Sequence, residues 1–259
     1  MCGVIGYLDK STPIDLNRFN RMRDTLKHRG PDGMGSILLK NQTVALGHRR
    51  LSIVDLSDSA SQPMTNSDSS IWLTYNGEIY NYEILRNELL EKNYDFKSNS
   101  DSEVLIHGYD EWGIEELLNR IDGIFAFAIW DSKLDKIIIA RDRFGVKPIY
   151  YFSKEHKFMF ASELKAIIEY DKINFNIDNS ALADFFIYSY VPSPKSIFNN
   201  ISKLPPGHYL TYSYNSNEIS ICKYWYIEFG NTIIDHDIAQ INAAELIENS
   251  IKGNLIGDV

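Results

Sequence analysis

Short apolar runs with strand character recur along the chain, and they occur in blocks between helical segments. In one such block, four runs follow one another without an intervening helix, at 124–130, 136–140, 149–152 and 158–161. A chain that forms an α/β sheet alternates strand and helix steadily instead. The block pattern therefore predicts an α+β fold built from layers of sheet and helix.

Hydrophobic periodicity and turn signals predict the remaining elements. Further strands are expected at 3–8, 37–39, 43–46, 71–75 and 209–212, and helices after Asp15, at 82–91, after Asp101, at 163–169 and at 180–188. Asn81 is placed to cap the helix at 82–91. The dipeptide Asn76-Gly77 is a strong signal for a tight hairpin turn, which would end the strand at 71–75.

The C-terminal segment predicts a second structural unit. Residues 1–212 are expected to form the main domain, and 213–235 a strand and a linker. Apolar residues from Ile238 to Ile251 then recur at helical spacing. Because no later segment is available to cover this apolar face, we interpret 236–259 as the first helix of a truncated second domain. The same face could also mediate assembly of a homodimer.

Charge and cysteine content argue against several classes of protein. The net charge is −9 and the 26 lysines and arginines are scattered, so we expect neither a nucleic-acid partner nor a membrane partner. The N-terminus also lacks a secretory signal. Only two cysteines, Cys2 and Cys222, are present, which excludes a disulfide framework and favours the cytoplasm. The six histidines are dispersed, and we expect no metal site.

Cys2 is the first candidate for catalysis. If Met1 is removed, the thiol shares its residue with a free α-amine. Such an amine has a pKa of about 8 and can accept the thiol proton. The amine can later protonate a leaving group, as in other N-terminal nucleophiles. The structural alternative is a small buried residue at the start of a strand, and Cys2 alone does not decide between the two.

Other positions carry the same ambiguity. The side-chain amide of Asn76 and the N–H of Gly77 could donate to one oxyanion, or the pair could form only a turn. Arg50 could bind a carboxylate through two hydrogen bonds, or lie in solvent. Asp101 could bind the ammonium of an amino acid, or cap a helix.

Taken together, ten motifs resemble those of glutamine-dependent asparagine synthetases and occur in the same order. They are MCGVIGY, KHRGPDG, HRRLSIVDLS, QPM, NGEIYNY, SDSEVLIHGY, DGIFAFAIWD, ARDRFGVKPIYY, FASELKAI and LPPGHYL. The resemblance covers essentially the whole chain. One departure is Lys27, where the family commonly has arginine, and this change keeps the positive charge.

The resemblance implies a four-layer αββα sandwich of the N-terminal-nucleophile type, with two antiparallel sheets between helices. It also implies a glutaminase site that needs no cofactor and binds L-glutamine. By position, Cys2 is implied as the nucleophile, and Asn76 and Gly77 as the oxyanion donors. The implied glutamine-binding residues are Arg50, Leu51, Ser52, Ile53, Val54, Asn76, Gly77, Glu78 and Asp101.

Further roles within the site follow from the same resemblance. Arg50 would bind the α-carboxylate of glutamine, and Glu78 and Asp101 its α-ammonium. Arg29 and Asn81 would orient the catalytic end. Glutamine is a zwitterion with an amide at its far end, so its site needs a cation, anions, a nucleophile and an oxyanion hole.

The resemblance implies a partner domain as well. In this family a second domain uses ATP to adenylate aspartate, which then takes up the ammonia released from glutamine. Its pyrophosphate loop resembles SGGLDSS, which does not occur here, so ATP and Mg²⁺ are expected only for a missing synthetase domain that would begin at 236–259. Two alternatives stay open: an amidotransferase that amidates a sugar acid for surface polysaccharide, and a non-catalytic binding module.

Overall fold

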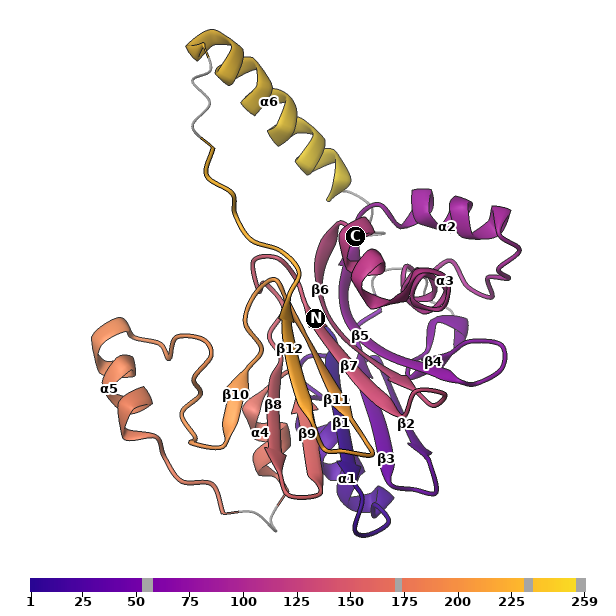
Figure 1. Ribbon diagram of the computed structural model, residues 1–259, viewed down its shortest axis with the longest axis vertical. Coiled ribbons are helices and arrows are strands. Elements are labelled where there is room, and N and C mark those ends of the chain that lie inside the picture. Colours follow the sequence, from indigo (N-terminus) through magenta and orange to yellow (C-terminus); the bar gives the residue numbers. More distant parts are fainter. Residues whose placement is uncertain (53–57, 171–173, 231–234, 255–259) are drawn as a thin grey trace.

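The computed structural model describes residues 1–52, 58–170, 174–230 and 235–254, and in this part of the chain two six-stranded sheets lie face to face (Figure 1). The first sheet contains β1 (Gly3–Asp9), β2 (Gly33–Leu39), β3 (Val44–Arg50), β8 (Tyr150–Lys154), β9 (Lys157–Ala161) and β10 (Ile201–Lys203). Their order across the sheet is β10-β8-β9-β1-β3-β2, and each recorded pair is antiparallel.

The second sheet has the order β12-β11-β7-β6-β5-β4 and is also antiparallel. Its strands are β4 (Met64–Thr65), β5 (Ile71–Ile79), β6 (Gly123–Asp131), β7 (Lys136–Arg141), β11 (His208–Ser213) and β12 (Ile219–Lys223). The expected strands are all present, whereas the short strands β4 and β10 and the edge strand β12 were not delimited from the sequence.

The helices are α1 (Leu16–Asp24), α2 (Tyr82–Glu91), α3 (Ser102–Arg120), α4 (Leu164–Ile168), α5 (Asn179–Tyr188) and α6 (His236–Gly253), with a short 3-10 turn at Asp58–Ala60. Asp15 caps α1 as expected, because its side chain accepts hydrogen bonds from the N–H groups of Asn17 and Arg18. Asp178 caps α5 in the same way.

Three apolar layers hold the sandwich together. One lies between the sheets, one between the second sheet and α2 and α3, and one between the first sheet and α1 and α4. Strand β6 shows how one strand serves two layers: Phe125 and Phe127 face the helices, while Ala126 and Trp130 face the other sheet. The order is therefore helix, sheet, sheet, helix, which confirms the expected α+β sandwich.

Gly6 on β1 leaves room for an aromatic ring close to its backbone. It pairs with Phe160 on β9, and a Cβ at Gly6 would lie 2.0 Å from the Phe160 ring. We expect Gly6→Ala to lower the free energy of unfolding by about 1–3 kcal/mol, because the buried ring must shift. Urea unfolding measures the change. The matched variant Ser153→Ala, on the exposed side of β8, should change stability by less than about 0.5 kcal/mol.

Two local expectations are wrong. Asn76-Gly77 does not form a hairpin turn, because β5 runs through both residues and pairs with β6. Gly77 instead permits close packing of the two strands, since a Cβ there would lie 2.3 Å from the carbonyl oxygen of Ile124. Asn81 precedes α2 but makes no capping hydrogen bond.

Helix α6 confirms the helix expected after 236 and lies outside the sandwich (Figure 1). None of its residues is buried, and Ile241 and Leu246 are 60% and 70% exposed. The domain limits expected at 212 and 235 stay predictions. No helix in the described ranges is long and apolar enough to cross a membrane.

Candidate active site

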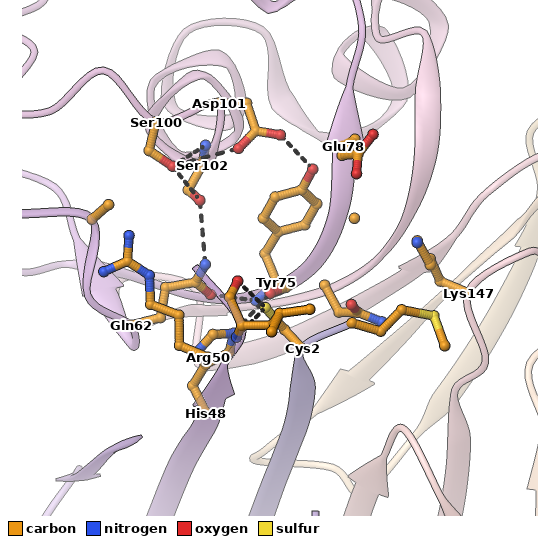
Figure 2. Close-up of a pocket in the computed structure, with 15 residues that line it drawn as sticks. Cys2, His48, Arg50, Gln62, Tyr75, Glu78, Ser100, Asp101, Ser102 and Lys147 are labelled. Carbon is orange, nitrogen blue, oxygen red and sulfur yellow. Dashed lines mark hydrogen bonds between the residues drawn. The ribbon is translucent and has the colours of Figure 1, made fainter. Parts of the chain in front are cut away.

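A cavity of about 110 Å³ lies at the end of the inter-sheet layer where β1 begins and β3 ends (Figure 2). Side chains at even positions of these two strands face the second sheet, as Val4 and Leu46 do in the apolar layer. Cys2 and Arg50 are the next even positions at these ends of the two strands, so their side chains are directed toward the same layer. The lining residues are Met1, Cys2, His48, Arg50, Leu51, Ala60, Gln62, Tyr75, Asn76, Gly77, Glu78, Ser100, Asp101, Ser102 and Lys147.

The thiol of Cys2 lies against the main chain of Leu51. The Leu51 N–H donates to Sγ at 3.4 Å, and Sγ lies 3.6 Å from the Leu51 carbonyl oxygen. Burial raises the pKa of the Cys2 thiol, while the Leu51 backbone, the terminal amine and Arg50 oppose that increase. The thiol therefore needs a base to become a nucleophile near neutral pH.

Asn76 brings an unpaired amide donor to the same cavity. Two residues earlier on β5, Thr74 donates to the Gly47 carbonyl of the other sheet at 3.1 Å, so even positions of β5 face the inter-sheet layer. Asn76 is 2% exposed, and its Nδ2 has no hydrogen-bond partner among the residues that the structure describes. A buried donor left unpaired costs about 1–3 kcal/mol. Its place in the wall beside Cys2 is where an oxyanion would satisfy it.

Asp101 contributes a buried carboxylate just before α3. Its Oδ2 accepts hydrogen bonds from the Tyr75 hydroxyl at 2.6 Å and from the Ile79 N–H at 3.0 Å. Burial raises the pKa of Asp101, and these two hydrogen bonds oppose the increase. The carboxylate makes no capping hydrogen bond to α3 because it is directed toward β5.

Arg50 and Glu78 complete the charged groups expected from the sequence. Arg50 ends β3, Glu78 lies near the end of β5, and both line the cavity. Ser52 does not line it, but lies in a neighbouring polar cavity of about 120 Å³ that shares Arg50. Ile53 and Val54 lie outside the described residues.

The structure separates the two residues expected to orient the catalytic end. Arg29 contacts the backbone of Cys2, because its Nε donates to the carbonyl oxygen of Cys2 at 2.9 Å. Asn81 is not part of the cavity wall. Its side-chain amide bonds the Arg120 carbonyl and the Asp122 N–H, both at 2.9 Å, which ties the turn after β5 to the end of α3.

Sequence reasoning missed six polar residues of the wall, namely His48, Gln62, Tyr75, Ser100, Ser102 and Lys147. Each lies in or next to a motif that carries the resemblance, but a motif does not show what its residues contact. Gln62 illustrates this: its Oε1 accepts the Tyr75 N–H at 2.6 Å, and its Nε2 donates to Ser102 Oγ at 3.2 Å. The side chain thus joins β5 to the start of α3 across the cavity.

His48 is a neutral imidazole in the wall. Its Nε2 lies 3.0 Å from the Tyr75 carbonyl oxygen, and its Nδ1 has no partner among the described residues. Burial lowers the pKa of His48 from 6.5 to about 4. At neutral pH the ring is therefore uncharged and weakly basic.

The shifted pKa of His48 predicts a loss of stability in acid. Between pH 6.5 and about 4 the unfolded imidazole binds a proton that the folded one does not, so stability falls as pH decreases through this window. The loss contributed by this group approaches about 3 kcal/mol below pH 4. In urea unfolding, His48→Gln is expected to reduce the acid-dependent loss, since glutamine does not titrate. If the free energy of unfolding falls equally with decreasing pH in wild type and in His48→Gln, this account is contradicted.

The cavity combines a thiol, an unpaired amide donor, a guanidinium and two carboxylates. Such a set suits a small zwitterion that carries an acyl group open to attack by sulfur. Among the described residues, no three histidine, cysteine or acidic side chains are grouped as metal ligands.

Comparison with known proteins gives a family and relatives. A family model described as a glutamine amidotransferase domain matches residues 1–225. Asparagine synthetase [glutamine-hydrolyzing] 3 of Bacillus subtilis is 37% identical, with 100% of this chain and 42% of that protein covered. A putative asparagine synthetase [glutamine-hydrolyzing] 2 of Methanocaldococcus jannaschii is 34% identical, with coverages of 100% and 53%. The chain thus spans about half the length of these relatives.

Solved structures share the fold. Glutamine phosphoribosylpyrophosphate amidotransferase from Bacillus subtilis superposes with a TM-score of 0.63 at 18% identity, over 86% of this chain and 49% of that one. The expected four-layer sandwich, with two antiparallel sheets between helices, is therefore confirmed.

Proposed function

The chain belongs to the glutamine amidotransferase family, and on this premise we propose that its cavity hydrolyses the side-chain amide of glutamine to glutamate and ammonia. One observation carries the proposal. The half-buried thiol of Cys2 shares a cavity with the Nδ2 of Asn76, which has no partner among the described residues, and Arg50 and Asp101 line the same wall.

The charged groups match the two ends of a zwitterion. Arg50 binds the α-carboxylate through its guanidinium, and Asp101 and Glu78 hold the α-ammonium. Burial raises the pKa of Asp101, which disfavours its ionised form. A bound ammonium stabilises that ionised form, because an opposite charge nearby favours ionisation. With its α-groups held in this way, glutamine presents its amide carbon to Cys2.

Catalysis begins once Met1 has been removed. The α-amine of Cys2 accepts the thiol proton, and the sulfur attacks the amide carbon while Asn76 and Gly77 donate to the oxyanion. The amine returns the proton to the leaving nitrogen, the C–N bond breaks, and ammonia departs from a thioester. Water then gives a proton to the amine and attacks the thioester, which releases glutamate and restores the thiol.

The other candidate base in the cavity is His48. It is a poor base at neutral pH because burial lowers its pKa to about 4, and a general base works best when its pKa lies near the working pH. Its Nε2 is already engaged with the Tyr75 carbonyl. The terminal amine is therefore the base that we propose.

Removal of Met1 provides the test. Protein that begins at Cys2 is expected to release glutamate from glutamine, whereas protein that retains Met1 loses about a hundredfold or more in kcat, because a peptide nitrogen cannot accept the proton. Intact-mass spectrometry identifies the two forms before the assay. Equal rates would rule out the amine as base, and no release from either form would support the non-catalytic module.

The activity of the whole protein is a further proposal, because the chain covers 42% and 53% of the two relatives described above. We propose that ammonia passes to a synthetase domain that holds ATP and Mg²⁺ and amidates aspartate, in the cytoplasm. In this scheme 1–212 is the glutaminase and 236–259 begins the partner domain. An acceptor assay on this protein together with such a synthetase domain, with aspartate and a sugar acid in parallel, tests aspartate against the sugar-acid alternative.

A further inference from the structure

Lys147 places a cation in the wall of the catalytic cavity. The residue is 8% exposed, and its side chain extends from the segment after β7 toward the cavity (Figure 2). In the described part of the chain, its recorded hydrogen bonds are made by the backbone alone. Keeping a cation in such a place costs free energy unless a partner or a function compensates.

The segment that carries Lys147 is held firmly. The Asp142 carboxylate, 1% exposed, accepts four backbone N–H groups, including those of Phe125 on β6 and of Lys147. The Arg141 guanidinium closes the loop from the other side through the carbonyl oxygens of Lys147 and Leu204, at 3.0 and 2.7 Å. The motif at 141–147 therefore fixes the lysine backbone at the cavity wall.

Several charged groups surround the N-terminal amine. In the chain that retains Met1, burial lowers the pKa of the Met1 amine, Arg29 and Lys147 lower it further, and the Cys2 thiol and Asp32 raise it. Met1, Cys2 and Lys147 line the same cavity, so the amine that Cys2 gains when Met1 is removed shares that cavity with Lys147. Elsewhere in the cavity the charged residues are Arg50, Glu78 and Asp101. Arg29 is balanced by the Glu163 carboxylate, 2.9 Å from its Nη1. The charge of Lys147 has no such counterpart among the described residues.

We propose that Lys147 is a positioning residue whose ammonium keeps the α-amine of Cys2 uncharged, so that the amine can accept the thiol proton. The inference rests on the proposed glutaminase function. A nearby positive charge disfavours protonation of the amine, and the effect is large where water is partly excluded. Lys147 is buried in the cavity wall and has no carboxylate partner among the described residues, so its charge is available to act on the amine.

The pH dependence of kcat/KM for glutamine hydrolysis tests the proposal. In Lys147→Met the amine keeps its proton to a higher pH, so the acidic limb of the kcat/KM profile shifts to higher pH. At about pH 6 the variant is expected to be roughly three- to tenfold slower than wild type, and the two profiles meet in alkaline solution. Lys147→Arg keeps the charge and should restore the wild-type limb. The matched control Lys154→Met removes an exposed lysine at the opposite end of the first sheet and should not move the limb.

A titration of the amine gives a second readout without activity. In protein labelled with ¹³C at Cys2, the chemical shift of its Cα is expected to titrate at higher pH in Lys147→Met than in wild type. An unchanged midpoint, or an acidic limb that Lys147→Met leaves in place, overturns the proposal even when glutamine is hydrolysed. Failure of wild type to hydrolyse glutamine instead contradicts the proposed function, and the titration still decides whether the charge acts on the amine.

Discussion

Cys2→Ala is expected to lower kcat for glutamine hydrolysis by at least about a thousandfold. Alanine at this position keeps the α-amine and the cavity but removes the sulfur that would form the thioester. Because the thiol contributes only weak contacts with the Leu51 main chain, at 3.4 and 3.6 Å, the fold should be retained. Glutamate release measured in a coupled assay gives the rate, and calorimetric titration shows that the variant still binds glutamine.

The second cysteine provides the matched control. Cys222 lies on β12 at the edge of the second sheet, outside the cavity wall. Cys222→Ala should keep kcat within about twofold of wild type, as expected for a change away from the site. Retained turnover in Cys2→Ala, or comparable losses in both variants, would show that Cys2 is not the nucleophile.

The sequence predicts most of the fold because its signals are local. Strands buried on both faces, such as β6, read as continuous apolar runs, and Asp15 marks the start of α1 by its capping chemistry. The layer order is a different matter. It depends on which face of each strand meets which neighbour, and here the resemblance supplied what periodicity could not.

Asn76-Gly77 shows where local reasoning fails. The dipeptide favours a tight turn when only its own backbone preference counts. Pairing with β6 at Ala126 and Phe125 overrides that preference and keeps both residues inside β5. Long-range pairing of this kind leaves no local mark on the sequence, so the turn was expected and a strand was found.

The candidate site shows the same limit. Cys2, Arg50 and Asp101 were nominated from their chemistry, and the structure brings them to one cavity. Gln62 and Lys147 were not nominated, because amides and lysines are ordinary surface residues until their surroundings are known. Their importance comes from tertiary contacts, such as the bridge that Gln62 makes between β5 and Ser102.

Asn76→Ala is expected to lower kcat about 10²- to 10³-fold with a much smaller effect on KM. Its Nδ2 has no partner in the described part of the resting protein, so the hydrogen bond that it donates is gained only when the oxyanion forms. Removing a buried unpaired donor leaves nothing unsatisfied behind. The free energy of unfolding should therefore be unchanged or slightly higher, which separates this variant from one that simply damages the fold.

Asn66, in the turn between β4 and β5, offers the opposite case. Its Oδ1 accepts the Ile71 N–H at 3.1 Å and its Nδ2 donates to Ser70 Oγ at 3.2 Å, so both ends of the amide are used in the resting state. Asn66→Ala should cost about 1–3 kcal/mol of stability and leave kcat close to wild type. The two asparagines thus predict opposite outcomes in unfolding and turnover assays. A stability loss in Asn76→Ala as large as that in Asn66→Ala, with kcat retained, would show that Nδ2 is a structural donor and that the oxyanion is stabilised elsewhere.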